Sequence, residues 1–250
     1  MNTTRIGLLM VALTATLPMH AAVVVPNAWA GTEAPSAFGM FASGVGQKLL
    51  QVNASSEFGA TPLLLTSVAL RPDVNLCPGN PCGAFSTTLH NLSVTLATTS
   101  HSPDDTGSDN VFGDYLTTNV VTVFSGDLTV SSSYTGPASG PKNFDILFPF
   151  TVPYLYNPAS GNLVVQFAIN GTDGLPVQMD AAQTTGDPVA RIFGSFAQAN
   201  GIGDSFGFVM QFQSQQQQSG APEPGTASLL LCGIAAAGGY LRRRGRRVIC

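Results

Sequence analysis

Charged residues are scarce in this chain: Lys, Arg, Asp and Glu together make up 10% of its 250 residues. Solvated helices carry many charges on their exposed faces, so the scarcity disfavours a helical domain. Gly, Ser, Thr, Asn and Pro are plentiful, and 44% of the residues are hydrophobic, which is enough to build a core. The composition predicts short strands joined by turns.

Basic residues are especially few in the middle of the chain. Between Ala22 and Ala221 there are four, against thirteen acidic residues, which gives a net charge of −9. A domain of this charge cannot replace the counterions of phosphate groups, so nucleic acid is excluded as a partner. Nearly all the remaining positive charge lies at the two ends.

Residues that could serve as a catalytic base are also few, because His90 and His101 are the only histidines after position 22. Near His101 lie Ser100, Ser102 and Asp104, which are the residue types of a hydrolytic triad. Neighbours in one loop seldom reach triad geometry, however, and the chain has no Gly-x-Ser-x-Gly motif. We therefore predict no enzyme and no catalytic residue, with a secreted hydrolase as the less favoured alternative.

Acidic residues are densest in one loop, which contains Asp104, Asp105, Asp109 and Asp114. Carboxylates in a loop suit calcium, but this spacing does not match an EF-hand, and Asp is common in turns. The sequence favours a solvated turn with no metal and no cofactor, and structural calcium stays open as the alternative. The domain has only two glutamates, Glu33 and Glu57, and nothing in the sequence places them together.

The N-terminus has the layout of a secretory signal peptide. Arg5 precedes an apolar run from Ile6 to Leu17, which is too short to span a bilayer comfortably. We expect cleavage near Ala21 and a signal peptide over residues 1–21, because a cut after Ala30 would discard the strand-like segment VVVP. An uncleaved anchor is the alternative.

The C-terminus combines an apolar segment with a cluster of arginines. Thr226 to Leu241 contains no charge, and a helix of its 16 residues covers about 24 Å, against about 30 Å for a hydrocarbon core. Long cationic side chains at the end of such a helix reach the interface and fix that end in the cytoplasm. The predicted stop-transfer residues are Arg242, Arg243, Arg244, Arg246 and Arg247. Everything between the two ends would then lie outside the inner membrane.

A Pro-Glu-Pro triplet, Pro222, Glu223 and Pro224, precedes the apolar segment. The order of triplet, apolar helix and arginine cluster over residues 222–247 resembles the PEP-CTERM sorting signal of bacteria with a two-membrane envelope and exopolysaccharide. The resemblance implies an exosortase as partner, a membrane-embedded peptidase or transpeptidase that processes its substrate near the triplet. It also implies only a transient membrane anchor. The tail from Val248 to Cys250 departs from this pattern, and a proline-rich hinge before a permanent anchor is the alternative.

Two cysteines, Cys77 and Cys82, flank the turn PGNP. In an oxidising compartment this spacing predicts a small disulfide, which would stabilise the fold by about 2 kcal/mol. A zinc site would need a second cysteine or histidine pair, and a redox centre would favour Cys-x-x-Cys.

The middle of the chain alternates between apolar and polar residues with a period of two. The clearest segments are NLSVTLATT, NLVVQFAIN and FGFVMQFQ, and turn-forming stretches such as SPDDTGSDN and NPASGN separate them. We predict an all-β domain over residues 22–212, an antiparallel β-sandwich that is jelly-roll-like, with a barrel as the competing topology. One helical turn is expected at Ala54 to Phe58, and a flexible glutamine-rich linker over residues 213–221.

Several segments of this domain, including VVVPNA, FDILFPF and PYLYNPASGNLVVQF, resemble extracytoplasmic domains that precede PEP-CTERM tags in environmental bacteria such as acidobacteria. The resemblance implies a β-fold and no particular activity. We therefore expect an exported, non-enzymatic envelope or matrix protein, structural or adhesive, with exopolysaccharide as a further partner. A carbohydrate-binding module on a permanent anchor is the alternative, and its candidate platform residues are Trp29, Tyr115, Tyr134, Tyr154 and Tyr156.

Overall fold

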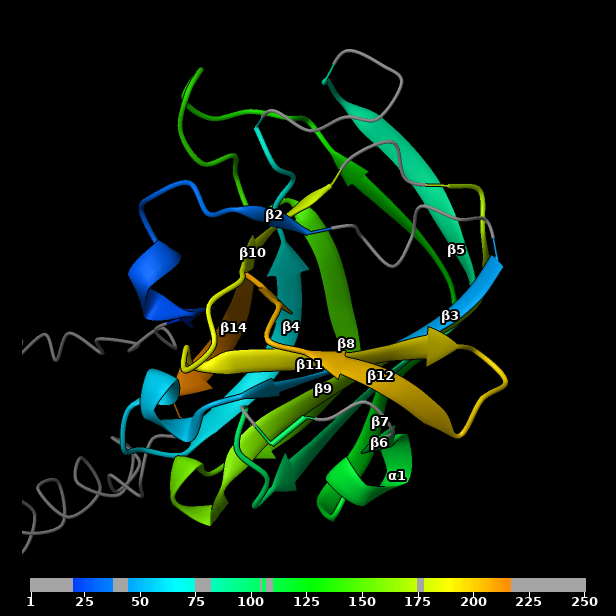
Figure 1. Cartoon of the computed structure of the whole chain (residues 1–250). Helices are drawn as coiled ribbons and strands as arrows, with labels where there is room; N and C mark the ends of the chain where they lie inside the picture. The colour runs from blue at the N-terminus through cyan, green and yellow to red at the C-terminus, as the bar shows by residue number, and fades with distance from the viewer. Residues whose placement is uncertain are drawn as a thin grey trace, which may run out of the picture. The chain divides into compact units, whose positions relative to one another are not determined.

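The computed structural model describes residues 20–37, 45–74, 82–103, 105–106, 110–174 and 178–216 (Figure 1). The chain divides into two units, Met1–Gln216 and Gln217–Cys250, and all described residues belong to the first. Residues 1–19 of the predicted signal peptide, Cys77 of the predicted disulfide and the whole predicted sorting signal lie outside the described residues. The described residues contain no helix with the length and apolar character that crossing a membrane requires.

The strands form antiparallel sheets, as predicted. One sheet has the order β1 (His20–Val25), β14 (Met210–Gln216), β4 (Leu63–Leu70) and β8 (Ile146–Tyr156). A larger sheet has the order β6 (Asn110–Val111), β12 (Asn200–Asp204), β11 (Val189–Ser195), β3 (Val45–Asn53), β9 (Asn162–Thr172), β5 (Phe85–Thr99) and β7 (Thr118–Ser132). A small third sheet joins β13 (Gly207–Phe208), β10 (Met179–Ala182) and β2 (Ser36–Ala37).

Helical structure is limited to single turns in the described residues. These are η1 (Asn27–Trp29), η2 (Ser55–Phe58), α1 (Phe112–Tyr115) and η3 (Pro158–Ser160). The expected helical turn after β3 is thus confirmed as the 3-10 helix η2, in which the buried Phe58 packs against Tyr156 and Phe212.

The main core lies between the two large sheets, which makes the architecture sandwich-like. Alternate residues of β5 point into this core, and they include Leu92, Val94 and Leu96. Phe148 of β8 meets Phe167 of β9 edge to face, with ring centroids 4.9 Å apart. Period-2 patterning therefore identified the inward face correctly, because successive strand residues point to opposite faces.

A second, smaller core covers part of the outer face of the larger sheet. Phe112 and Tyr115 of α1 cover the sheet residues of this core. These are Leu50, Val52, Ala97, Val164 and Ile192. Strands β3 and β9 are thus apolar on both faces. This explains why their sequences contain apolar runs as well as alternation.

Strand β8 contains two prolines, Pro149 and Pro153, and lies at the edge of its sheet. Among the described strands, β8 pairs only with β4. Its other side forms no backbone ladder with another described strand, so the N–H groups that the prolines lack are not needed there. The sheet order therefore explains how a proline-containing segment can still form a long strand.

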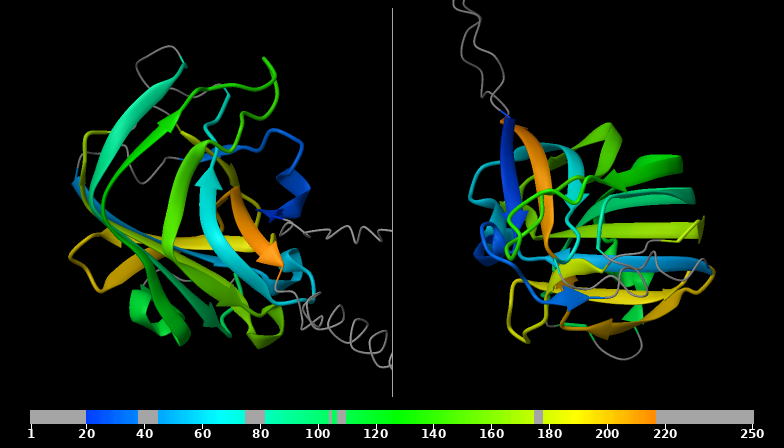
Figure 2. Two further views of the ribbon diagram at one scale, coloured as in Figure 1. Left: turned by 180° about the vertical axis from the view of Figure 1, so that it is seen from behind. Right: turned by 90° about the horizontal axis from the view of Figure 1, so that it is seen from above.

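Strand β14 extends further than the sequence analysis predicted. It pairs with β1 through Gln215 and with β4 through Gln216, so residues 213–216 belong to the domain and not to a flexible linker (Figure 2). The polar composition suggested a linker, but Ser214 is fully buried and its hydroxyl donates to the carbonyl oxygen of Ala21 at 3.0 Å. Backbone pairing on both sides holds this polar segment in the sheet.

Candidate functional site

Among the described residues near position 101, His101 is paired with an aspartate, Asp105, and not with a serine. His101 Nδ1 lies 2.7 Å from Asp105 Oδ2, and the ring stacks on Tyr115 with centroids 4.4 Å apart. Ser100 and Ser102 are exposed, and no described serine hydroxyl contacts the ring. Asp104 lies outside the described residues.

The acidic loop, the predicted alternative calcium site, is only partly described. Asp105 is engaged by His101, and its carbonyl oxygen accepts a hydrogen bond from Tyr115 at 2.6 Å. Asp114 is exposed on α1, whereas Asp104 and Asp109 lie outside the described residues. Asp105 therefore takes part in a local hydrogen-bond network with His101 and Tyr115.

His90 joins three adjacent strands on the surface of the larger sheet. Its Nε2 lies 3.1 Å from Asp173 Oδ1, just after β9, and its Nδ1 lies 3.5 Å from Asp127 Oδ2 on β7. Hydrogen bonds to Asp173 and then Asp127 raise the pKa of His90, while the backbone N–H of Asn91 and the His90 ring lower the pKa of Asp127. The side chains of His90 and of both aspartates are exposed, so this arrangement is open to solvent.

We expect Asp173→Asn to lower the pKa of His90 toward its ordinary value of about 6.5, because it removes the strongest partner of the protonated ring. The stabilisation from protonated His90 is complete below the unfolded-state pKa and is lost as the pH rises through the higher folded-state pKa. NMR titration of the imidazole ring measures the shift. Asp105→Asn, which does not touch His90, is the control, and an unchanged titration in Asp173→Asn would contradict the assignment.

The tyrosines considered as a sugar platform are mostly internal. Tyr154 and Tyr156 share one face of β8, but that face is the core, and their side chains are 1% and 0% exposed. Their hydroxyls contact Thr98 and the carbonyl of Gly161, and burial raises the pKa of both tyrosines. Tyr115 is also buried, so three of the five candidate platform residues cannot present a surface to a sugar.

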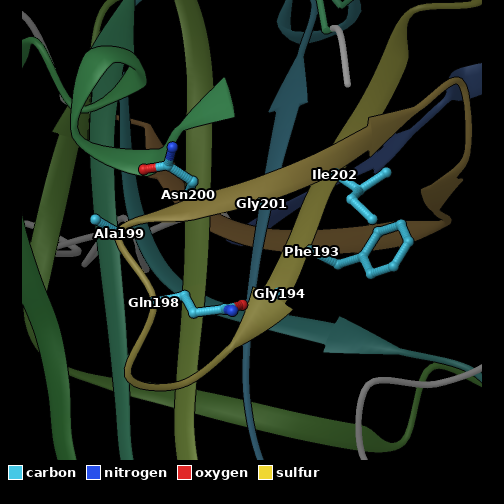
Figure 3. Close-up of a pocket in the computed structure, with 7 residues that line it drawn as sticks. All are labelled: Phe193, Gly194, Gln198, Ala199, Asn200, Gly201 and Ile202. Atoms are coloured by element: carbon cyan, nitrogen blue, oxygen red, sulfur yellow. The ribbon is translucent and has the colours of Figure 1, made fainter. Parts of the chain in front are cut away.

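A surface pocket instead lies on the β11–β12 hairpin (Figure 3). Phe193 and Ile202 face each other across the hairpin and are 38% and 57% exposed, and Gln198 and Asn200 contribute amides to the lining. Gly201 is required here, because a Cβ at this position would lie 2.7 Å from both Phe112 and Ile192. The pocket therefore combines an exposed ring with amide groups.

Three carboxylates from distant parts of the chain converge beyond the C-terminal end of β4. Glu33 precedes β2, Asp73 follows β4, and Asp180 lies on β10; the bridge between Pro72 and Met179 brings these segments together (Figure 1). One oxygen of each carboxylate lies within 4.8 Å of the others. We call these three residues the carboxylate cluster.

Arg71 is the cation of this region and is almost completely buried, at 1% exposure. Its Nε donates to Asp180 Oδ2 at 2.7 Å, and a terminal nitrogen donates to the carbonyl oxygen of Thr32 at 2.7 Å. The guanidinium also lies over the ring of Phe144, 4.9 Å from its centroid. Arg71 is thus fixed on several sides and holds Asp180 in place.

Two carboxylate oxygens of the cluster are buried without a hydrogen-bond partner among the described residues. They are Glu33 Oε2 and Asp180 Oδ1. Glu33 Oε1 accepts from the backbone N–H of Val74 at 2.9 Å, and Asp180 is 0% exposed. Burial raises the pKa of Asp180 to about 7, against the lowering effect of Arg71. Buried polar atoms without a hydrogen-bond partner are uncommon in folded proteins, and each of them calls for an explanation such as a bound ion or water.

Sequence reasoning missed this cluster because its members share no motif and are far apart in the chain. The available signal was indirect: Arg71 and Asp180 are charges beside apolar strand segments in a chain with few charges. Such charges are buried only when they are paired.

Comparisons of the chain with protein-family models, with curated proteins and with solved structures find no match.

Proposed function

We propose that the chain is an exported, non-enzymatic protein of the cell envelope or extracellular matrix, which an exosortase sorts and processes through the C-terminal signal. The observation that carries the proposal is the order of Pro222-Glu223-Pro224, the apolar segment Thr226 to Leu241 and the arginine cluster. Each proline restricts its own backbone and that of the preceding residue, so the triplet favours an extended conformation that a peptidase can bind.

The fold is compatible with this role. Strand β14 ends at Gln216, so five residues separate the last strand from the triplet. The sheet orders β1-β14-β4-β8 and β3-β9-β5-β7 support a jelly-roll-like pairing of two sheets, in which β11 and β12 would be additions beside β3. We infer a jelly-roll-like scaffold with a structural or adhesive role in an exopolysaccharide matrix.

Replacing Pro222, Glu223 and Pro224 by alanine tests the sorting signal. In the native host we expect the variant to remain at full length in the inner membrane, whereas the wild-type protein is shortened and reaches the outer envelope or medium. Immunoblots of membrane fractions and mass spectrometry of the new C-terminus measure the difference. Alanines at residues 218–220, just before the triplet, are the matched control. A triplet variant with unchanged size and location would instead favour a permanent anchor.

A carbohydrate-binding module is the second candidate function, and the hairpin pocket favours it. The exposed ring of Phe193 offers an apolar face for a sugar, and Gln198 supplies an amide at the same pocket. In this role, polysaccharide would contact β11 and β12 and not the tyrosines that the sequence suggested as a sugar platform.

A further inference from the structure

The geometry of the carboxylate cluster matches the size of a calcium ion. Calcium–oxygen distances are about 2.3–2.6 Å, so two oxygens on opposite sides of one ion are about 5 Å apart. One oxygen each of Glu33, Asp73 and Asp180 lies within 4.8 Å of the others. A single ion placed among these three oxygens would therefore lie close to the calcium–oxygen distance from each of them.

The charge of the region matches a divalent cation. When all three carboxylates are ionised, they and Arg71 carry a formal charge of −2, and Arg71, Asp73 and Asp180 are 1%, 4% and 0% exposed. Burying net charge away from water is costly unless an opposite charge compensates it. A cation of charge +2 would make the group neutral.

The unpartnered oxygens are an independent indication of a ligand. Asp180 is completely buried, and while Arg71 and the N–H of Ala34 engage its Oδ2, its Oδ1 has no hydrogen-bond partner in the described residues. Glu33 Oε2 is also buried and has no hydrogen-bond partner among the described residues. Both atoms belong to carboxylates of the cluster, and a bound cation would give each of these oxygens the partner that it lacks among the described residues.

The donor set selects the kind of ion. The cluster offers only oxygen, with no His or Cys, and this disfavours zinc. Magnesium binds oxygen at about 2.0–2.1 Å and usually keeps several waters, which suits a buried site poorly. We propose that Glu33, Asp73 and Asp180 bind a structural calcium ion, with Arg71 as the counter-charge that positions Asp180.

This inference does not depend on the sorting signal, and it differs from calcium binding by the acidic loop. An ion at the cluster would connect the segment before β2, the end of β4 and strand β10. Calcium should therefore stabilise the fold as a whole. The shift of the unfolding equilibrium toward the folded state grows with the ratio of the calcium concentration to its Kd.

The test uses the full-length chain, purified in detergent and stripped with EDTA. Calorimetric titration with CaCl₂ measures binding, and circular dichroism melts measure stability. At a calcium concentration of 100 times Kd we expect about a 100-fold shift of the unfolding equilibrium and a Tm increase of about 5–10 °C. Magnesium at the same concentration should give a smaller increase. An equal response to magnesium, or no response to calcium, would overturn the proposal.

Glu33→Gln separates a ligand from a merely structural residue. Without calcium this variant should be at least as stable as the wild type, because it removes one negative charge from a group of neighbouring carboxylates. With calcium it should bind at least about 10-fold more weakly and lose most of the Tm increase. Asp105→Asn, which removes the same charge from the acidic loop, is the control and should respond like the wild type. Loss of binding in Asp105→Asn but not in Glu33→Gln would place the ion elsewhere and overturn the proposal.

Discussion

Replacing Arg71 by methionine is expected to lower the free energy of unfolding by about 3–5 kcal/mol, which is the usual cost of leaving one partner of a buried ion pair without the other. Arg71 and Asp180 are 1% and 0% exposed, so water cannot solvate the remaining carboxylate. The substitution also removes the donor to Thr32 and the contact with Phe144. Urea unfolding, followed through the single tryptophan, measures the loss, because Trp29 packs against the core.

Two further variants identify the cause of that loss. Arg71→Met combined with Asp180→Leu should recover most of the stability, since replacing both partners of a buried pair by apolar residues is often nearly neutral. Arg191→Met is the matched control. It should lose less stability than Arg71→Met, because the ion pair between Arg191 and Asp204 is closer to solvent, with side chains 10% and 30% exposed. A loss below about 1 kcal/mol in Arg71→Met would contradict the importance of the buried pair.

A chain that begins at Gly31 is expected not to fold cooperatively, whereas a chain that begins at Ala22 should fold. The shorter chain lacks β1 and with it the completely buried Val25 and the core contact of Trp29. It also exposes the edge of β14, where unpaired backbone groups promote aggregation. Size-exclusion chromatography and thermal melts of the two chains measure the difference.

The same experiment bears on signal-peptide cleavage, which remains a prediction. A cut near Ala21 leaves the pairs of β1 from Ala22 to Val25 intact, whereas a cut after Ala30 removes the whole strand. Melting of the shorter chain within a few degrees of the longer one would contradict the role of β1. Val25→Ala in the longer chain is the control for the loss of core volume alone, and it should lower the Tm while cooperative unfolding persists.

The long strands could be predicted because each carries its own pattern. Segments such as NLVVQFAIN contain enough apolar residues at alternate positions to identify the strand and its inward face. Strand β12 was missed because its sequence, NGIGD, is typical of a turn, and it forms a strand only through pairing with β11 and β6. Tertiary pairing outweighed local propensity there, as it did at the polar end of β14.

The carboxylate cluster could not be predicted, because a sequence shows only how densely acidic residues lie along the chain. Proximity in the fold depends on the pairing of strands, and Asp73 and Asp180 meet only through the bridge between Pro72 and Met179. In the densest acidic loop, the described Asp105 is held by His101. Charges that are buried, rather than charges that are numerous, mark the candidate site.

Strand β14 lies between β1 and β4, side by side with the first strand of the domain (Figure 2). A ribosome makes β1 first and β14 last, so the four-stranded sheet cannot close while the chain is still growing. Until β14 emerges, β1 and β4 lack the strand that pairs with both of them, and the backbone edges that face it stay unpaired. The order of synthesis therefore delays completion of this fold until nearly the whole polypeptide is available.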